Sequence, residues 1–162
     1  MIACNPKQQT EHYSRNSITF FDPIKFSTQN NKNTFKIEAR FSECGEWGGH
    51  KEEIIIFADT SRMFYATYKV FPFNCDSLPY YNYKENLTPT IIKTIVLNDT
   101  TKKSIIDYVL RLTQSKITER FPGHAGNLFS IANSDSTFYI QVYDSKEFDI
   151  KSFRQLVTEL IK

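Results

Sequence analysis

The segment from residue 35 to residue 41 alternates strictly between apolar and polar side chains. Successive side chains of a β-strand point to opposite faces, so this period of two predicts a strand with one buried face. Two further β-rich runs, residues 54–58 and 63–70, are separated only by Asp59-Thr60-Ser61-Arg62 and predict a β-hairpin. The chain is therefore expected to build an antiparallel sheet.

The second half of the chain adds helices to this pattern. Residues 91–97 predict a further strand, which we place in the centre of the sheet, and the capping side chains of residues 98–101 predict the start of a helix. Apolar residues recur at near-helical spacing after that point, and the helix is expected to end near Arg120.

A second hairpin and a second helix follow. Residues 127–132 and 137–143 predict the hairpin, and Asp149 can cap a final helix with one apolar stripe. A short edge strand is expected at residues 18–21. The whole pattern predicts an α+β fold: a mostly antiparallel sheet of about five or six strands, packed on one face by two helices.

Length and polarity indicate one domain preceded by a tether. Residues 1–17 show no hydrophobic periodicity and are expected to form a flexible tether, whereas residues 18–162 are expected to form a single α+β domain. A chain of 162 residues can bury a sufficient core without a metal.

Charge and hydropathy argue against two classes of function. The chain carries 20 Lys and Arg against 18 Asp and Glu, for a net charge of +2, and no window gathers the basic residues into a stripe. Binding of nucleic acid is therefore not expected. The longest apolar runs are far shorter than the roughly 20 residues of a membrane-spanning helix. Any membrane association would therefore use an anchor.

The first residues suggest such an anchor. The segment Ile2-Ala3-Cys4, followed by a polar run, resembles the lipobox of bacterial lipoproteins and the tether behind it. The resemblance implies a lipid on Cys4, a membrane-anchored domain in the cell envelope that faces the periplasm or the exterior, and a signal that is trimmed or lies upstream. In the alternative interpretation, Cys4 is an ordinary thiol in a frayed terminus and the protein is cytoplasmic.

The other two cysteines lie near each other in the predicted hairpin. In a hairpin centred on Thr60 and Ser61, the numbers of facing residues add up to about 121, and those of Cys44 and Cys75 add up to 119. If the protein is exported, we expect a Cys44–Cys75 disulfide, and a lipid on Cys4 accounts for the odd cysteine. In a reducing compartment the pair would be buried thiols.

Two loops are candidate binding surfaces. Glycine permits unusual backbone conformations and close approach of a ligand, so one candidate combines the glycine-rich segment with its histidine. Its residues are Glu46, Trp47, Gly48, Gly49 and His50. Alternatively, these glycines only shape a turn while Trp47 plugs one end of the core.

The second loop is the proline-interrupted segment from residue 71 to 89. Its Tyr80, Tyr81 and Tyr83 would present aromatic contact area on a stiff loop, as many protein-binding surfaces do. In the alternative interpretation, this loop folds back over an edge of the sheet.

The histidines allow a weaker, catalytic hypothesis. If the loops of His50 and His124 met, the two side chains could act as acid and base, or could bind a metal together with Glu46, Glu52 or a cysteine. Their separation of 74 residues matches no zinc motif, and the chain has no nucleophile elbow, phosphate-binding loop or dinucleotide motif. A nucleophilic Cys44–His50 pair would require a free thiol. We assign no catalytic residue, metal or cofactor.

These features favour a non-enzymatic cell-envelope binding module, tethered through Cys4, that binds another protein. An inhibitor or an immunity-type protein would fit a small domain without catalytic motifs. The alternative is a small hydrolase or metal-assisted enzyme using His50 and His124. A third hypothesis is a structural envelope component that self-assembles through an extensive apolar patch.

Overall fold

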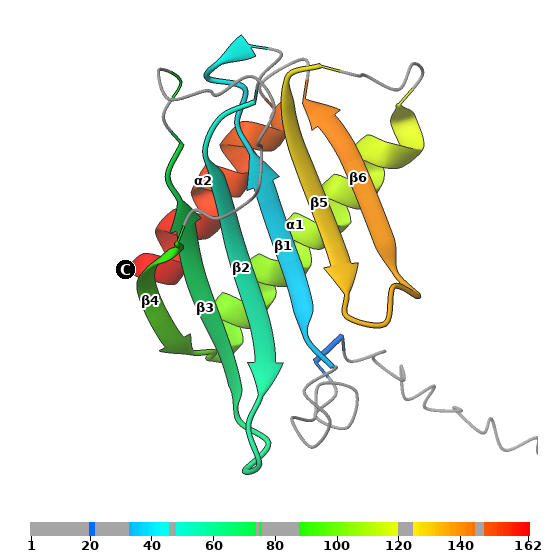
Figure 1. The fold of residues 1–162 in the computed structure, drawn as a ribbon. Helices are drawn as coiled ribbons and strands as arrows, with labels where there is room; N and C mark the ends of the chain where they lie inside the picture. Colours follow the sequence, from blue (N-terminus) through cyan, green and yellow to red (C-terminus); the bar gives the residue numbers. More distant parts are fainter. Residues whose placement is uncertain are drawn as a thin grey trace, which may run out of the picture.

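The computed structural model describes residues 20–21, 33–45, 48–73, 75, 88–119, 125–144 and 148–162, which form one antiparallel sheet and two helices (Figure 1). The elements in chain order are β1 (Phe35–Arg40), β2 (Lys51–Ala58), β3 (Phe64–Phe71), β4 (Thr90–Val96), α1 (Asp99–Thr118), β5 (Asn127–Asn133), β6 (Tyr139–Asp144) and α2 (Phe148–Ile161). The predicted α+β class is confirmed.

The alternating segment β1 lies in the middle of the sheet. The strand order is β4-β3-β2-β1-β5-β6, and every neighbouring pair is antiparallel. Ile37 faces Ile54 of β2 on one side and Ile131 of β5 on the other, and all three side chains are fully buried. The period of two in the sequence therefore predicts the buried face correctly, because each β1 side chain points to the face that its parity requires.

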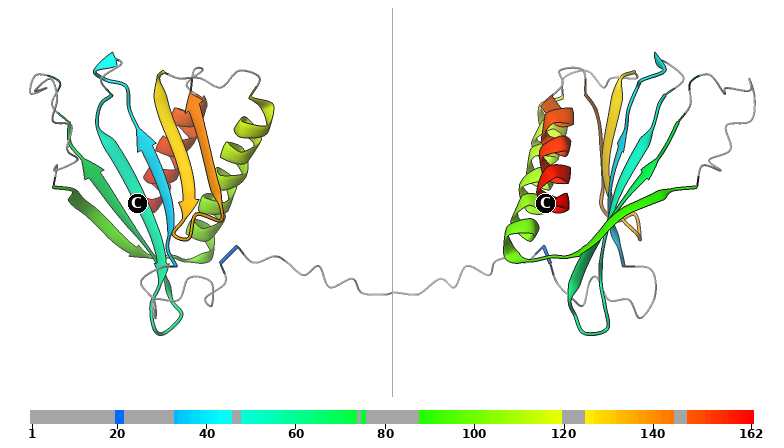
Figure 2. Two further views of the ribbon diagram at one scale, coloured as in Figure 1. Left: turned by 45° about the vertical axis from the view of Figure 1, so that its right-hand side comes forward. Right: turned by 90° about the vertical axis from the view of Figure 1, so that its left-hand side faces the viewer.

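Both helices pack against the same face of the sheet (Figure 2). Their apolar stripes meet the apolar side chains of the strands, and this layer forms the hydrophobic core. Its largest fully buried side chains are Phe129, Phe153, Ile37, Ile54, Ile56, Ile105, Leu112 and Ile131. None of the helices in the described part of the chain is long and apolar enough to cross a membrane.

Helix α1 begins where its capping residues predict. The side chain of Asn98 accepts a hydrogen bond from the backbone N–H of Thr101 at 2.9 Å, which satisfies a donor that the first turn leaves without a partner. The helix ends at Thr118, close to the predicted end near Arg120, which lies outside the described residues.

Three local predictions require correction. Strand β4 lies at an edge of the sheet, not in its centre, because β-propensity reports a pleated environment and not a position in the strand order. Asp149 does not precede α2 but lies in its first turn, where it is buried and accepts a hydrogen bond from Ser115 of α1 at 2.8 Å. Phe20 and Phe21 are not in a strand, and residues 18 and 19 lie outside the described residues.

The β2–β3 hairpin brings the two cysteines together. Ile54 faces Tyr68, so the numbers of facing residues add up to 122, one more than predicted. Cys44 and Cys75 form a disulfide at the open end of this hairpin, with their Cα atoms 5.6 Å apart.

Candidate functional site

The side of the sheet opposite the helices, which we call the uncovered face, carries no other described element (Figure 2). Because side chains alternate along a strand, this face receives the polar set of each central strand. Its charged residues are Lys36, Glu38 and Arg40 of β1, Lys51 and Glu53 of β2, and Lys69 of β3.

Glu38 is buried on this face although no described helix covers it. Lys36 Nζ donates a hydrogen bond to Glu38 Oε2 at 2.9 Å, and Arg40 Nε donates one to Oε1 at 2.7 Å. Burial alone would raise the pKa of Glu38, but these two hydrogen bonds and the positive charges of Lys36 and Arg40 together hold the pKa below its usual value. The flanking cations therefore shield the carboxylate and keep it charged.

A second carboxylate lies beside the first. Glu53 faces Glu38 directly across the β1–β2 ladder, and Lys69 faces Glu53 across the β2–β3 ladder. Lys51 Nζ contacts Glu53 Oε1 at 3.0 Å. The cations thus offset a juxtaposition of like charges that would otherwise destabilise the ladder.

The charges at the centre of this face are mainly positive toward solvent, whereas Asp59, next to β2, accepts a hydrogen bond from Tyr65 at 3.1 Å. Four cations accompany two acids, so the six charged side chains carry a net charge of +2. The side chains of Lys36 and Arg40 are 43% and 48% exposed, whereas that of Glu38 is 7% exposed. An approaching molecule would therefore meet the cations before the carboxylates.

Aromatic side chains flank this charged centre. Phe57 of β2 stacks on Tyr65 of β3 with ring centroids 5.5 Å apart, and Lys51 Nζ lies 4.1 Å from the centroid of Phe71. On edge strand β6, the exposed Tyr139 donates a hydrogen bond to Gln141. Aromatic and cationic side chains together are typical of protein interfaces.

A second polar cluster lies on the covered face, at the disulfide end of the sheet. Its centre is Glu52 of β2, a buried carboxylate. Glu52 accepts hydrogen bonds from the hydroxyl of Tyr68 in β3 and from the guanidinium of Arg154 in α2, and His50 Nε2 lies 2.9 Å from its Oε1. Burial, and then the bond to Glu52, raise the pKa of Tyr68.

His50 is held between two carboxylates. Its Nδ1 lies 2.6 Å from Glu43 Oε1, opposite the contact of its Nε2 with Glu52, and its ring stacks on Phe41 at 4.4 Å. Although burial opposes the effect, hydrogen bonds from the His50 ring and backbone N–H hold the pKa of Glu43 below its usual value. Both ring nitrogens contact protein oxygens, so this geometry leaves neither for a substrate.

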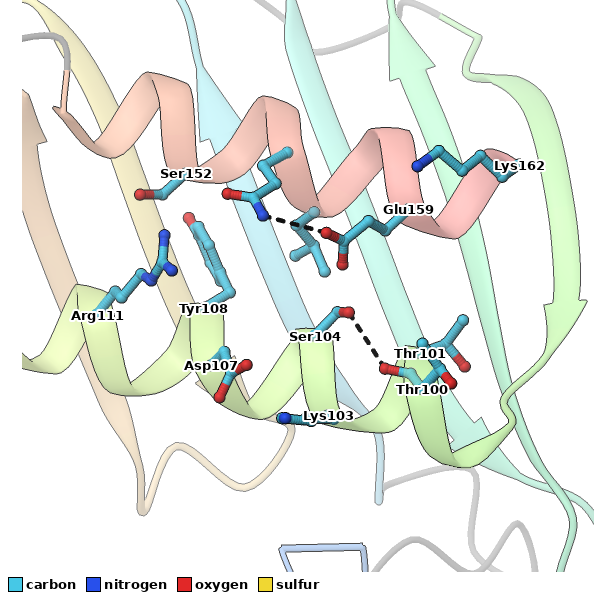
Figure 3. Close-up of a pocket in the computed structure, with 12 residues that line it drawn as sticks. Thr100, Thr101, Lys103, Ser104, Asp107, Tyr108, Arg111, Ser152, Glu159 and Lys162 are labelled. Carbon is cyan, nitrogen blue, oxygen red and sulfur yellow. Dashed lines mark hydrogen bonds between the residues drawn. The ribbon is translucent and has the colours of Figure 1, made fainter.

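A groove of about 440 Å³ lies between the two helices on the side away from the sheet (Figure 3). Its rim mixes charges of both signs: Lys103, Arg111 and Lys162 with Asp107 and Glu159. One of the acids, Glu159, accepts a hydrogen bond from Gln155 at 3.1 Å. The groove therefore offers no uniform charge to a ligand.

The glycines of the predicted binding loop shape the turn between β1 and β2. A Cβ atom on Gly49 would lie 2.3 Å from the carbonyl oxygen of Phe41, and Gly48 has a positive φ of 84°. Both observations support the alternative in which these glycines serve the turn.

Most of the other predicted site residues are not described. Within the predicted loop, only Gly48, Gly49 and His50 are described, and His50 belongs to the Glu52 cluster. The residues outside the described part of the chain are Cys4, Glu46, Trp47, Tyr80, Tyr81, Tyr83 and His124. The proposed meeting of His50 and His124 therefore stays a prediction.

The uncovered face was missed as a candidate site, although a signal for it exists. The alternation of residues 35–41 separates Lys36, Glu38 and Arg40 from the core. The predicted hairpin sum of 121 would place Glu53 opposite Tyr68, and only the observed sum of 122 places it opposite Lys69. The alternation does not indicate by itself that no described helix covers this side of the sheet. The part played by Arg154 has no local signal, since only the packing of α2 brings it to Glu52.

Metal binding finds no support in the described ranges, where no group of three or more His, Cys, Asp or Glu side chains is arranged to hold a metal ion.

The comparisons with known proteins supply no family: neither a scan against models of protein families nor a search of characterised proteins found a match. Function is therefore inferred from the uncovered face, the Glu52 cluster and the helix groove.

Proposed function

We propose that this protein is a non-enzymatic binding module of the cell envelope, tethered through Cys4, that binds another protein through the uncovered face of its sheet. The observation that carries the proposal is the composition of that face: cations above shielded carboxylates, with exposed and stacked aromatic rings beside them. An inhibitor or immunity-type role fits such a surface on a small domain.

The Glu52 cluster supports binding over catalysis. A catalytic histidine needs a ring nitrogen within reach of the proton that it moves. In His50 the two nitrogens contact Glu43 and Glu52 at 2.6 and 2.9 Å. The hydrolase alternative with His50 and His124 would require His50 to leave one of these carboxylates.

The cysteines support an envelope location. Disulfides form and persist mainly in oxidising compartments, and the Cys44–Cys75 bridge fits such a location. A lipid on Cys4, as the lipobox resemblance implies, would leave no unpaired thiol.

Site-specific photocrosslinking in the native host tests the binding surface. A benzophenone side chain replaces Thr67, which lies on the uncovered face of β3 between Tyr65 and Lys69, and the matched control replaces Leu110, which is exposed on α1. We expect a discrete protein adduct from position 67 and none from position 110. Adducts only from position 110, or none from either position, would contradict the proposed surface.

Mass spectrometry of the native protein tests the location. We expect Cys4 to carry a lipid and the peptides of Cys44 and Cys75 to stay linked without reductant. An unmodified Cys4 together with two free thiols would exclude the envelope part of the proposal and leave the binding surface to be judged by crosslinking alone.

A further inference from the structure

We infer that the partner presents an acidic protein surface to the uncovered face, and that Lys36, Arg40, Lys51 and Lys69 recognise it. This inference rests on the proposed function and adds the chemistry of the partner. It follows from a difference in solvent exposure: the carboxylates of this face are buried, and the cations lie between them and solvent.

The two carboxylates of this face are buried beneath the cations. Glu38 and Glu53 face each other across β1 and β2, and both are less than a tenth exposed. Lys36 and Arg40 contact Glu38, and Lys51 contacts Glu53, so each acid is already neutralised within the chain. A cationic partner would find no accessible carboxylate at the centre of this face.

The ammonium groups lie closer to solvent than the carboxylates, and they keep N–H donors that a partner could use. A lysine ammonium has three N–H donors. The described contacts use one donor of Lys36, for Glu38, and one of Lys51, for Glu53. Lys69 makes no ion pair with any described residue, so its charge is the most available of the four.

The same charges disfavour two other occupants. A second copy of this chain, docked face to face, would oppose one +2 surface to another, and like charges across an interface are costly. Polyanions such as nucleic acids or anionic membranes bind through many cations, whereas the strands of this face carry four cations and a net charge of only +2.

The aromatic flanks favour a protein. Phe57 and Tyr65 stack on each other near the turn of the β2–β3 hairpin, and Tyr139 is exposed on β6. These rings provide apolar contact area that a protein interface would bury and that a phosphate backbone would not use. A partner with glutamate or aspartate beside aromatic or aliphatic side chains complements both parts of the face.

An acidic probe tests the inference without a known partner. A random copolymer of glutamate and tyrosine is titrated into the isotope-labelled full chain, and backbone amide shifts are followed by NMR at low and high salt. We expect shifts at Lys36, Lys51 and Lys69, none at Lys103 on α1, and weaker binding as salt rises.

Two matched variants distinguish the effect of a cation on the uncovered face from the effect of the net charge of the protein. Lys69→Gln removes a cation from the uncovered face, and Lys103→Gln removes one from α1; thermal unfolding confirms that both fold. We expect Lys69→Gln to weaken binding of the copolymer about three- to tenfold and Lys103→Gln less than about twofold.

Several outcomes would overturn the inference. These are absence of copolymer binding, shifts confined to the helix layer, equal effects of the two variants, tighter binding to phosphatidylserine vesicles than to the copolymer, or self-association through this face. If crosslinking from position 67 succeeds while the copolymer fails, only the acidic chemistry of the partner is wrong. If both fail, the proposed function fails with it.

Discussion

Glu52 and Glu53 are neighbours in β2, yet they belong to different parts of the molecule. Both are buried, with 2% and 8% of their surface exposed, but Glu52 points to the covered face and Glu53 to the uncovered face. Glu52 is neutralised by Arg154, which is 102 residues away on α2. Glu53 is contacted by Lys51, two residues away on the same strand.

This difference separates two causes of burial. On the covered face, Arg154 of α2 and Tyr68 of the neighbouring strand β3 contact the carboxylate, so its environment depends on tertiary packing. On the uncovered face, the long stems of cationic residues shield the carboxylates locally. The first arrangement ties the carboxylate to distant parts of the fold, and the second leaves charged groups at the surface.

The largest expected effect removes a support that both regions share. Cys44 and Cys75 enclose β2 and β3, and therefore Glu52 and Glu53, in a closed loop with a sequence separation of 31. Replacing both cysteines by alanine is expected to lower the free energy of unfolding by about 3 to 4 kcal/mol, because the unfolded chain gains the loop's entropy. Urea denaturation of the oxidised, reduced and variant proteins measures this loss. Equal free energies of unfolding would show that packing alone stabilises the disulfide end of the sheet.

The next effect distinguishes the two faces directly. Arg154→Met leaves the buried Glu52 without its guanidinium and is expected to lower the free energy of unfolding by about 2 kcal/mol. The matched variant Arg40→Met, on the uncovered face, is expected to cost about 1 kcal/mol or less, because Lys36 still contacts Glu38. Equal losses in urea denaturation would contradict the distinction.

A smaller effect appears in the dependence on pH. Folding lowers the pKa of Glu38 and of Glu43, so each carboxylate stabilises the folded state above about pH 4.5. That contribution is lost as the pH falls through the lowered pKa. In the wild-type protein the free energy of unfolding should decrease as the pH falls. We expect Glu38→Gln to reduce this decrease more than Glu43→Gln does, because Glu43 is half exposed. Urea denaturation at a series of pH values from about 3 to about 7, which spans the ordinary pKa of a glutamate, measures this decrease.

The smallest effect is expected at Lys69. Because this residue has no ion pair among the described residues, Lys69→Gln should change the free energy of unfolding by less than about 0.5 kcal/mol, while still weakening binding to an acidic partner. Thermal and urea unfolding check this point. A large loss of stability would instead assign Lys69 to the support of Glu53, which it faces across β2 and β3.

Sequence patterns predicted most of the secondary structure. The alternation of β1, both hairpins, the Asn98 cap and the disulfide could be predicted because each depends on neighbouring residues or on hairpin numbering. The edge position of β4 could not, because β-propensity is similar for strands that have one neighbour and strands that have two.

The candidate site was less predictable than the fold. His50 was identified from its glycine-rich surroundings, but these do not reveal that Glu43 and Glu52 occupy its two ring nitrogens. The uncovered face needs three strands in register, and it also depends on both helices packing on the same side. These are relations between distant segments, which no local pattern contains.

The amino-acid sequence by itself determined which side chains of each strand would share a face, where α1 would begin, and that Cys44 and Cys75 could meet. These features follow from the period of two in strands and from local capping. Only the tertiary structure decided that one face would be covered, that Arg154 would neutralise Glu52, and that four cations would stand above two carboxylates on the other face. The physical reason is that burial and ion pairing depend on distances between segments, which the packing of helices and the order of strands set.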